Sequence, residues 1–314
     1  MKIMVGMGSI DDYPAFVHAG AKEIFVGYVP HFWMKKYGSH QALNRREVLY
    51  YNVQIGSFSE LMILSEMVKK YKVPVSIALN ALHYKKECYE DLFEIMESCM
   101  SLGFSSFIVA DGDFLKAVFK KKIAGLEMIV SGEYGEINAG IVSEFEDNKV
   151  KRIIFPRQTT IEEMRELVQL HPNLEYEAFA LNEKCHFTGA YCNSIHCDEF
   201  CHMCKVPFLM GGKERLDEIS DSSIYEEEEP VTGFSGCALC AFWDYWKIGI
   251  THLKIVSRGN GSQATETDIK KVEEALIILK QCQSKAEYIK KMKKTLFPRG
   301  CSHNCYASSL PERI

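Results

Sequence analysis

Cysteines are concentrated in one part of this chain, at spacings that suit metal binding. Of the twelve cysteines, five fall between positions 185 and 204, and a Cys-x2-Cys pair follows them. Clustered thiolates bind zinc or hold iron–sulfur clusters. The sequence therefore predicts metal chemistry in this segment. The candidate metal ligands are Cys185, Cys192, Cys197, Cys201, Cys204, Cys237 and Cys240.

The remaining cysteines form two groups. Cys88, Cys99 and Cys282 stand singly in helical patterns, and we interpret them as small buried hydrophobic residues. Cys301 and Cys305 form a Cys-x3-Cys pair near the end of the sequence, and the pattern alone gives this pair no role.

Two metal centres are compatible with the spacing of the clustered cysteines. Cys201 and Cys204 together with Cys237 and Cys240 form two Cys-x2-Cys pairs, which suit tetrahedral structural zinc. A zinc site of this kind leaves the first two cysteines of the segment without a role. A [4Fe–4S] cluster would use those two as well, and seven clustered cysteines exceed the four that one cluster needs.

Eight short apolar runs alternate with amphipathic stretches along most of the chain. Such nearly continuous apolar runs are typical of parallel strands that are buried on both faces. Eight strands joined by helical crossovers predict an α/β fold of the (β/α)8 barrel type, and an open doubly wound sheet is the alternative. We expect strands at 2–6, 23–29, 74–80, 105–111, 127–132, 151–156, 176–181 and 252–258.

The predicted barrel domain spans residues 1–283 and carries two irregular intervals. Residues 30–56 form a long connection between the second and third strands. Residues 182–251 form a cysteine-rich insertion after strand seven, and we expect it to fold over the C-terminal mouth of the barrel. Residues 284–314 are predicted to be a C-terminal tail.

Polar residues stand at the carboxyl ends of several predicted strands, where barrel enzymes place their active sites. The planar guanidinium of Arg157 could hold a carboxylate or a phosphate. Asp111 could act as an acid, a base or an orienting group. A structural hydrogen bond at the barrel rim is the alternative for each. The expected strand-end residues are Asn80, Asp111, Ser131, Arg157 and Arg258.

Glu177 is a further catalytic candidate, although its place early in a buried strand also suits a structural role. A buried carboxylate needs a cationic partner. Lys254, on the neighbouring eighth strand, is the partner that we expect if Glu177 is structural.

Composition and charge restrict the expected partners. The formal net charge of −5 provides no general positive field for nucleic acid, so a small molecule or a partner protein is favoured over RNA. Lys120 to Lys122 form the basic patch that an RNA would need. No apolar run is long enough for a membrane span, and the N-terminus is a poor signal peptide. We expect a cytoplasmic protein with reduced thiols and no membrane partner.

The stretch "LEYEAFALNEKCHFTGAYC" resembles the signature of the U32 family of collagenase-like peptidases. Glu177, Cys185 and Cys192 keep the spacing of that signature. The segments "SIALNAL", "FIVADGDFL" and "RIIFPRQTTIEEM" are similar to further parts of the family pattern. The resemblance covers roughly residues 1–280. The chain differs from the family pattern at Val256, where "KIVSRG" stands in place of Lys-Ile-Glu-Gly-Arg.

The U32 resemblance implies a [4Fe–4S] cluster. It implies Cys185, Cys192 and Cys237 as ligands, with one of Cys204 and Cys201 as the other. Well-studied members of the family serve oxygen-independent hydroxylation of a ubiquinone precursor or of RNA pyrimidines. The resemblance therefore implies an iron–sulfur protein that modifies an aromatic ring in a small molecule or in RNA.

Three alternative functions remain open from the sequence. The chain could be a cluster-bearing subunit that serves a partner protein, a U32-type peptidase, or a non-catalytic barrel that zinc stabilises. The peptidase alternative has no support from local motifs, since neither Gly-x-Ser-x-Gly nor His-Glu-x-x-His occurs in the sequence.

Overall fold

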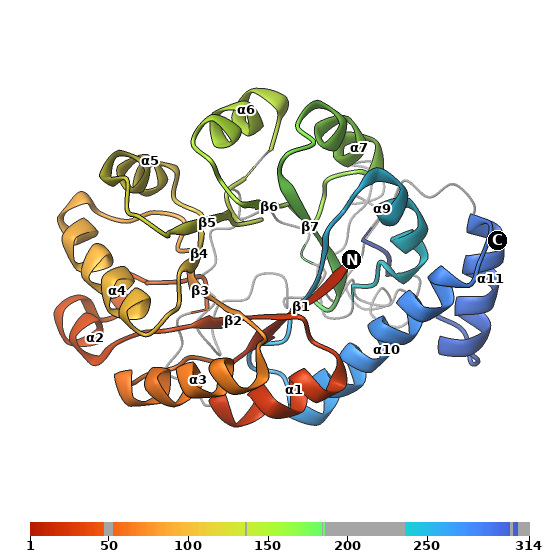
Figure 1. Cartoon of the computed structure of the whole chain (residues 1–314), viewed down its shortest axis with the longest axis horizontal. Helices are drawn as coiled ribbons and strands as arrows, with labels where there is room; N and C mark the ends of the chain where they lie inside the picture. The colour runs from red at the N-terminus through yellow and green to blue at the C-terminus, as the bar shows by residue number, and fades with distance from the viewer. Residues whose placement is uncertain (47–52, 136, 184, 186–235, 302–303, 307–314) are drawn as a thin grey trace, which may run out of the picture.

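Eight parallel strands close into a barrel, and helices surround it (Figure 1). This computed structural model describes residues 1–46, 53–135, 137–183, 185, 236–301 and 304–306. The strands follow one another in sequence order, and the first pairs with the eighth. The prediction of a (β/α)8 barrel is therefore confirmed, and the open sheet is excluded.

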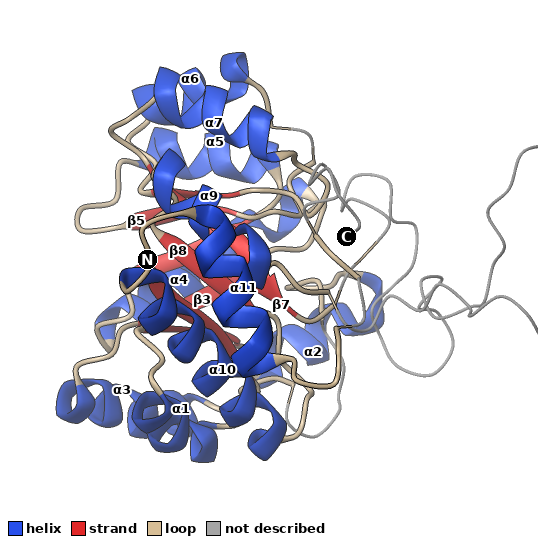
Figure 2. Cartoon of the chain, turned by 90° about the vertical axis from the view of Figure 1, so that its right-hand side faces the viewer, coloured by secondary structure: helices blue, strands red, loops and turns tan. Residues whose placement is uncertain are grey.

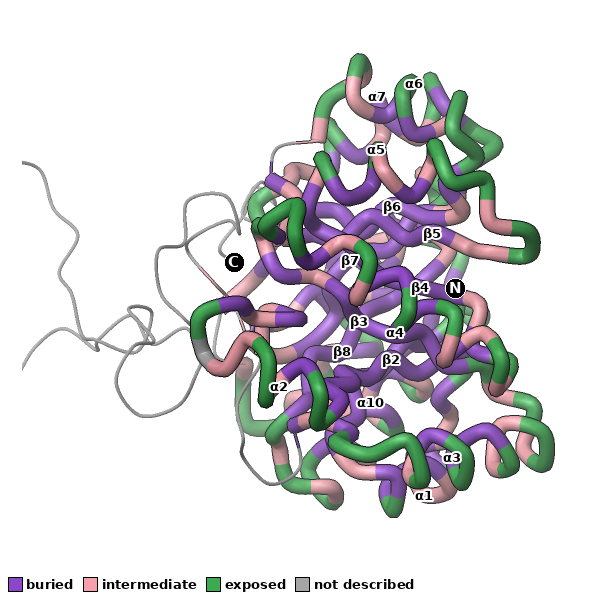
Figure 3. The backbone as a smooth tube through the Cα atoms, turned by 90° about the vertical axis from the view of Figure 1, so that its left-hand side faces the viewer, coloured by how far each residue is buried: buried purple, intermediate pink, exposed green. Residues whose placement is uncertain are grey.

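The eight predicted strands are all present. Their residues are almost completely buried, because the barrel interior covers one face and the helices cover the other (Figures 2 and 3). The strands are β1 (Lys2–Met7), β2 (Glu23–Gly27), β3 (Val75–Leu79), β4 (Ser106–Val109), β5 (Glu127–Val130), β6 (Arg152–Ile154), β7 (Glu175–Leu181) and β8 (His252–Ile255).

The helices of the outer ring begin at the caps that the sequence provides. Thr160 Oγ1 accepts a hydrogen bond from the backbone N–H of Glu163, whose carboxylate accepts one from the N–H of Thr160. Ser57 and Glu60 form a second capping box. The helices are α1 (Tyr13–Ala19), α2 (His31–Tyr37), α3 (Phe58–Tyr71), α4 (Tyr89–Ser101), α5 (Gly112–Lys121), α6 (Ala139–Asp147), α7 (Ile161–Leu170), α9 (Phe242–Ile248), α10 (Ser262–Lys280) and α11 (Lys285–Leu296).

The interval 30–56, expected to be irregular, contains helix α2. Trp33 anchors this helix, because its side chain is completely buried and its indole N–H donates to the backbone oxygen of Gln41. The chain then returns to the barrel, where Ile55 forms a β-bridge with Tyr28 just beyond β2. The connection is thereby held against the carboxyl end of β2.

The insertion after β7 leaves and re-enters the described part of the chain at the same place. Leu181, the last residue of β7, forms an antiparallel bridge with Cys237, and the N–H of Asn182 donates to Gly236. The described residues on either side of the gap, Asn182 and Cys237, therefore lie together at the carboxyl end of β7, and the later part of the predicted insertion forms helix α9. Residues 186–235, which carry most of the predicted insertion, lie outside the described residues.

The segment predicted as a C-terminal tail begins with helix α11. Tyr288 of α11 is completely buried, and its hydroxyl donates to the backbone oxygen of Leu239 at 2.6 Å. This contact packs α11 against the short turn that precedes α9. Among the described residues, no helix combines the length and the apolar character needed to cross a membrane.

A buried network of charges fills the barrel interior toward the amino ends of the strands. Arg152 of β6 is 1% exposed and donates to Glu177 of β7 at 2.9 Å and to Glu23 of β2 at 2.6 Å. Lys254 of β8 donates to the other oxygen of Glu177 at 2.9 Å, and His252 Nε2 lies 3.4 Å from Glu23. Burial opposes the charge of both carboxylates, but His252 and Arg152 hold the pKa of Glu23 below its ordinary value, and Lys254 and Arg152 do the same for Glu177.

We predict that Arg152→Met destabilises the protein by about 3–5 kcal/mol, because the variant leaves two buried carboxylates without their central cation. The free energy of unfolding from urea titration measures this cost. Both carboxylates have folded pKa values below the ordinary 4.5, so their pairing stabilises the fold above that pH and is lost as the pH falls through the folded pKa. The cost should therefore shrink below about pH 4.5.

The matched control for this prediction is Lys69→Met, which removes an exposed cation that pairs with Glu66 on the surface of α3. This variant should change the unfolding free energy little at any pH, since exposed pairs contribute little. Equal costs for the two variants would contradict the role given to Arg152.

Candidate functional site

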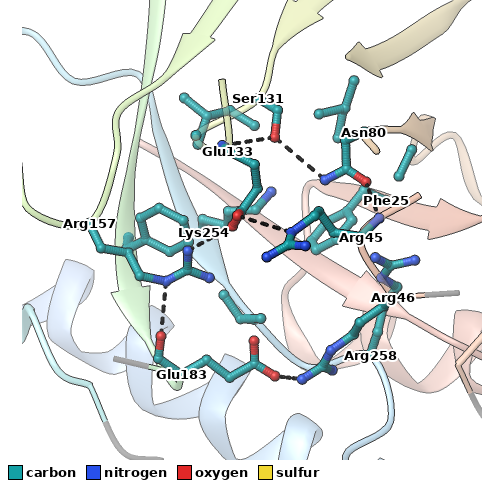
Figure 4. A pocket seen from close by; sticks show the side chains of 16 residues that line it. Phe25, Arg45, Arg46, Asn80, Ser131, Glu133, Arg157, Glu183, Lys254 and Arg258 are labelled. Atoms are coloured by element: carbon teal, nitrogen blue, oxygen red, sulfur yellow. Dashed lines mark hydrogen bonds and ion pairs between the residues drawn. The ribbon is translucent and has the colours of Figure 1, made fainter. Parts of the chain in front are cut away.

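A pocket opens at the carboxyl ends of the strands, the face where (β/α)8 enzymes hold their active sites (Figure 4). Apolar side chains from alternate strand positions form its base, and charged side chains surround it. The lining residues are Phe25, Arg45, Arg46, Ala78, Asn80, Ile108, Ser131, Gly132, Glu133, Ile154, Arg157, Phe179, Glu183, Lys254, Val256 and Arg258.

The structure brings four of the five expected strand-end residues to this pocket. The amide of Asn80 donates to the hydroxyl of Ser131 at 3.4 Å, and its oxygen accepts from the backbone N–H of Arg45 at 3.2 Å. Arg157 and Arg258 lie on other sides of the same pocket (Figure 4). Residues from four different strand ends therefore face one space.

Asp111 has a different environment. One of its oxygens accepts from the backbone N–H groups of Asp113 and Phe114, so it caps the N-terminus of α5. The other oxygen accepts from the N–H of Tyr84 at 2.6 Å. Asp111 does not line the pocket. Asp111 therefore forms structural hydrogen bonds at the barrel rim, which was the alternative to a catalytic role in the sequence analysis.

Glu177 lies below the pocket, where it is completely buried between Arg152 and Lys254. Lys254 is the partner that the sequence suggested for a structural Glu177. The ammonium group of Lys254 does line the pocket and lies 3.8 Å from the ring centre of Phe25. Burial lowers the pKa of Lys254, and Glu177 only partly opposes the shift. Glu177 therefore connects the charged network to the base of the pocket.

Positive charge exceeds negative charge around the pocket. Of the described side chains, five basic and two acidic ones line it, and Glu177 beneath it adds one further acid. Glu133 accepts from Arg157 at 2.9 Å and lies 3.5 Å from Arg45. Glu183 forms an ion pair with Arg46. The surplus of positive charge around this pocket favours a ligand that carries negative charge.

Arg258 contributes most directly to this surplus. Its side chain is buried and donates to the amide oxygen of Asn44 at 3.1 Å, and no acid among the described residues forms an ion pair with it. Burial, and then the charge of Arg46, lower the pKa of Arg258. Gly27 makes room for it, because a Cβ at this position would collide with the guanidinium. An anion bound here would relieve the electrostatic cost of burying Arg258.

Arg157 joins the pocket to the start of the cysteine-rich insertion. Its guanidinium lies 4.2 Å from the ring centre of Phe179, and its Nε donates to the backbone oxygen of Glu183. Burial opposes its charge, but Glu133, Tyr306 and Cys185 outweigh burial and raise the pKa of Arg157. Cys185 is therefore close enough to this cation to interact with its charge.

Comparison with known protein families identifies the chain. The model of Peptidase family U32 matches residues 8–313. The chain belongs to peptidase family U32. A search of curated protein sequences finds no match.

Solved structures resemble this U32 chain at low sequence identity. The U32 peptidase Mk0906 shares 11% identity with a TM-score of 0.46, covering 82% of this chain and 92% of that chain. N-acetylneuraminate lyase from Fusobacterium nucleatum shares 9% identity with a TM-score of 0.50, covering 93% and 80% of the two chains. The second likeness supports the barrel fold and nothing further.

The candidate metal ligands of this U32 chain fall into three groups. Cys185 is half-buried beside the pocket, where its backbone oxygen accepts from the side chain of Gln158. Cys237 and Cys240 lie beyond the end of β7. Among the described residues, no three ligand side chains are arranged to hold a metal as they stand. The others, Cys192, Cys197, Cys201 and Cys204, lie outside the described residues.

Sequence reasoning missed several charged residues of the pocket. Arg45 and Arg46 come from the long connection after β2, while Glu133 and Glu183 follow β5 and β7. The run Asn44-Arg45-Arg46 was a usable signal, since two adjacent arginines in a connection that starts at a strand end can reach a barrel mouth.

We predict that the pocket of this U32 protein binds benzoate and discriminates against uncharged benzamide. Arg258→Met should weaken benzoate binding by about 10- to 100-fold, as expected for loss of a charge-assisted hydrogen bond of about 1.5–3 kcal/mol. Isothermal titration calorimetry measures both ligands. Arg165→Met changes a half-buried arginine of α7 that does not line the pocket. It is the matched control and should bind benzoate like the parent protein. Equal affinity for benzoate in all three proteins would contradict the proposed anion site.

Proposed function

We propose that this U32 protein takes part in oxygen-independent, hydroxylation-type modification of a small aromatic molecule that carries an acidic group. The observation that carries the proposal is the pocket at the barrel mouth, which has surplus positive charge and Cys185 at its edge. A pocket of this kind suits an anionic small molecule, and an adjacent thiol suits a redox cofactor beside the bound substrate.

The cysteines at the start of the insertion provide the thiolate donors that a [4Fe–4S] cluster uses. Cys185 and Cys192 would be two of its ligands, and the remaining ligands would come from Cys197, Cys201, Cys204 and Cys237. A cluster with four thiolate ligands carries net negative charge, and Arg157 provides a partly buried cation near Cys185. Hydroxylation of a ring is a two-electron oxidation, so such a cluster, when bound, would carry electrons from the substrate toward an electron acceptor.

The side chains of the pocket would bind and orient the substrate. Arg258 and Arg157 would hold a carboxylate or a phosphate through their planar donor groups. Asn80 and Ser131 present an amide and a hydroxyl to the same space, and they would bind a polar ring substituent. Phe25 at the base would pack against the aromatic ring.

The pocket supports a small molecule better than RNA. Of its five described cations, Lys254 and Arg258 are buried and the other three are partly buried, whereas an RNA backbone requires an exposed basic surface. The net charge of −5 gives no general attraction for a polyanion. A partner protein that supplies or receives electrons remains compatible with this interpretation.

The peptidase activity in the family description is the second candidate, and the matching family model is the observation that favours it. The pocket offers little for peptide hydrolysis. Ser131 is the hydroxyl residue that lines it, and this hydroxyl accepts from Asn80 and from the backbone N–H of Glu133. Within the described part of the chain, no histidine lines the pocket, so no imidazole there can serve Ser131 as the base that a serine nucleophile needs.

We predict that protein purified without oxygen contains iron and acid-labile sulfide and absorbs broadly in the visible range. Cys192→Ala should lose most of the iron, because the variant lacks one ligand. Cys88→Ala, which changes a buried cysteine of the barrel, should keep it. Metal analysis and the absorption spectrum provide the measurement. Anaerobic preparations with no iron would contradict the cofactor.

The proposed reaction requires a test in cells. A deletion strain and its parent are grown without oxygen, and their nucleosides and quinones are compared by mass spectrometry. We expect a hydroxylated aromatic product to be lost in the deletion strain and restored by the parent gene, but not by Arg258→Met. Unchanged profiles, together with peptide cleavage by pure protein that Cys192→Ala abolishes, would favour the peptidase.

A further inference from the structure

Two cysteine pairs that are far apart in the sequence lie side by side at the edge of the barrel. Cys237 and Cys305 form a parallel β-bridge. The N–H of Cys237 donates to Asn304 at 3.0 Å, and the N–H of Tyr306 donates to Cys237 at 3.1 Å. Bridged residues on neighbouring strands lie about 4.8 Å apart and direct their side chains to the same face. The two thiols therefore start from adjacent backbone positions.

Short turns of the backbone lie next to the other cysteine of each pair, Cys240 and Cys301. The N–H of Ala241 donates to the backbone oxygen of Ala238 at 2.8 Å. This tight turn holds Cys240 near Cys237. After α11, Gly300 adopts a φ of +95° and its N–H donates to Phe297, which reverses the chain just before Cys301. Cys240 follows Cys237 by three residues and Cys301 precedes Cys305 by four, so the bridge between Cys237 and Cys305 brings all four cysteines into one region.

Helix α11 is fixed to the first cysteine pair by a separate contact. The buried hydroxyl of Tyr288 donates to the backbone oxygen of Leu239, which lies between Cys237 and Cys240. The end of α11 is therefore held at a defined distance from this turn, and the second pair follows a few residues later. The backbone that carries the two cysteine pairs is therefore held in place by contacts among described residues.

The charges around these thiols suit a metal centre with four thiolate ligands. Burial, together with the neighbouring Cys240 and Cys305, raises the pKa of Cys237 to about 11, although Lys271 opposes the shift. Burial also raises the pKa of Cys240, whereas Lys293 lowers it. Four thiolates and one divalent cation carry a net charge of −2, which the two lysines would offset. Without a cation the site packs neutral thiols together.

We propose that Cys237, Cys240, Cys301 and Cys305 form a second metal site that binds Zn²⁺ and fastens the C-terminal segment to the barrel. A Cys-x2-Cys and a Cys-x3-Cys pair provide the four thiolates of a closed tetrahedral zinc site, in which no position stays open for a substrate. The described side chains do not yet converge on one point, so the cation completes the site by rotating thiols on a backbone that is already in place. Binding releases the thiol protons.

This assignment separates the cysteines outside the barrel core into two sets. Cys237 cannot serve both sites, so the zinc site would take it from the cluster, whose ligands would then come from the five cysteines of residues 185–204. The two sites then have different purposes. One lies beside the pocket, where redox chemistry would occur. The other closes the connection between the end of β7 and the segment after α11.

The test is zinc analysis of the full-length protein purified with zinc in the medium. We expect about one zinc per chain in the parent and almost none in the double variant Cys301→Ser/Cys305→Ser. Cys88→Ala/Cys282→Ala, which changes two buried cysteines of the barrel, is the matched control and should keep its zinc. Cys301→His should also keep it, because histidine can replace cysteine as a zinc ligand.

A second measurement covers the case in which the double variant folds poorly. In the parent, a chelator should lower the melting temperature, and added Zn²⁺ should restore it. Zinc retained by the double variant would overturn the proposal, as would a Cys237–Cys305 disulfide in the intact protein or iron in place of zinc at these thiols. The iron content of Cys192→Ala tests the cluster separately. A wrong zinc proposal can therefore be distinguished from a wrong cluster proposal.

Discussion

The pairing of Arg152 with two carboxylates inside the barrel is the constraint on which the rest of the structure depends. A guanidinium that is 1% exposed must have anionic partners, and Glu23 and Glu177 provide them from strands that are far apart in the sequence. These contacts cross the barrel and fix β2, β6 and β7 relative to one another. Glu177 also binds Lys254 and thereby places an ammonium group at the base of the pocket. The charges that fill the barrel interior thus continue into the candidate site.

The pocket above this network has more positive than negative charge, and Arg258 shows why this matters. It is buried against an amide and another cation, an arrangement that an anionic ligand would stabilise. Arg157 extends the same positive region to Cys185, where the insertion begins. This arrangement is the basis for the proposal that an acidic substrate would bind next to a thiolate-bound metal centre. The cysteines around the pocket have different neighbours. Cys237 forms a β-bridge with Cys305 after α11, whereas Cys185 lies near Arg157.

Much of the fold could be predicted from local patterns. Strands buried on both faces have continuous apolar runs, and the capping box at Thr160 and Glu163 is a local signal for the start of a helix. Closure of the barrel then implied that residues at the carboxyl ends of the strands lie around one mouth. Asn80 and Ser131 do hydrogen-bond there. Asp111 follows the same pattern but caps a helix, because its carboxylate reaches the nearest free backbone N–H groups first.

The sequence by itself determined the strands, the helix starts, the barrel and the polar residues that follow its strands, because each depends on residues that are close in the chain. Only the tertiary structure decided which distant side chains share a site. Arg45 reaches the pocket because a long connection folds back on β2, and no local pattern sets the path of such a connection. Cys305 meets Cys237 because α11 packs against the turn that precedes α9. Contacts of this kind depend on the packed core, which holds partners that are distant in the sequence next to each other.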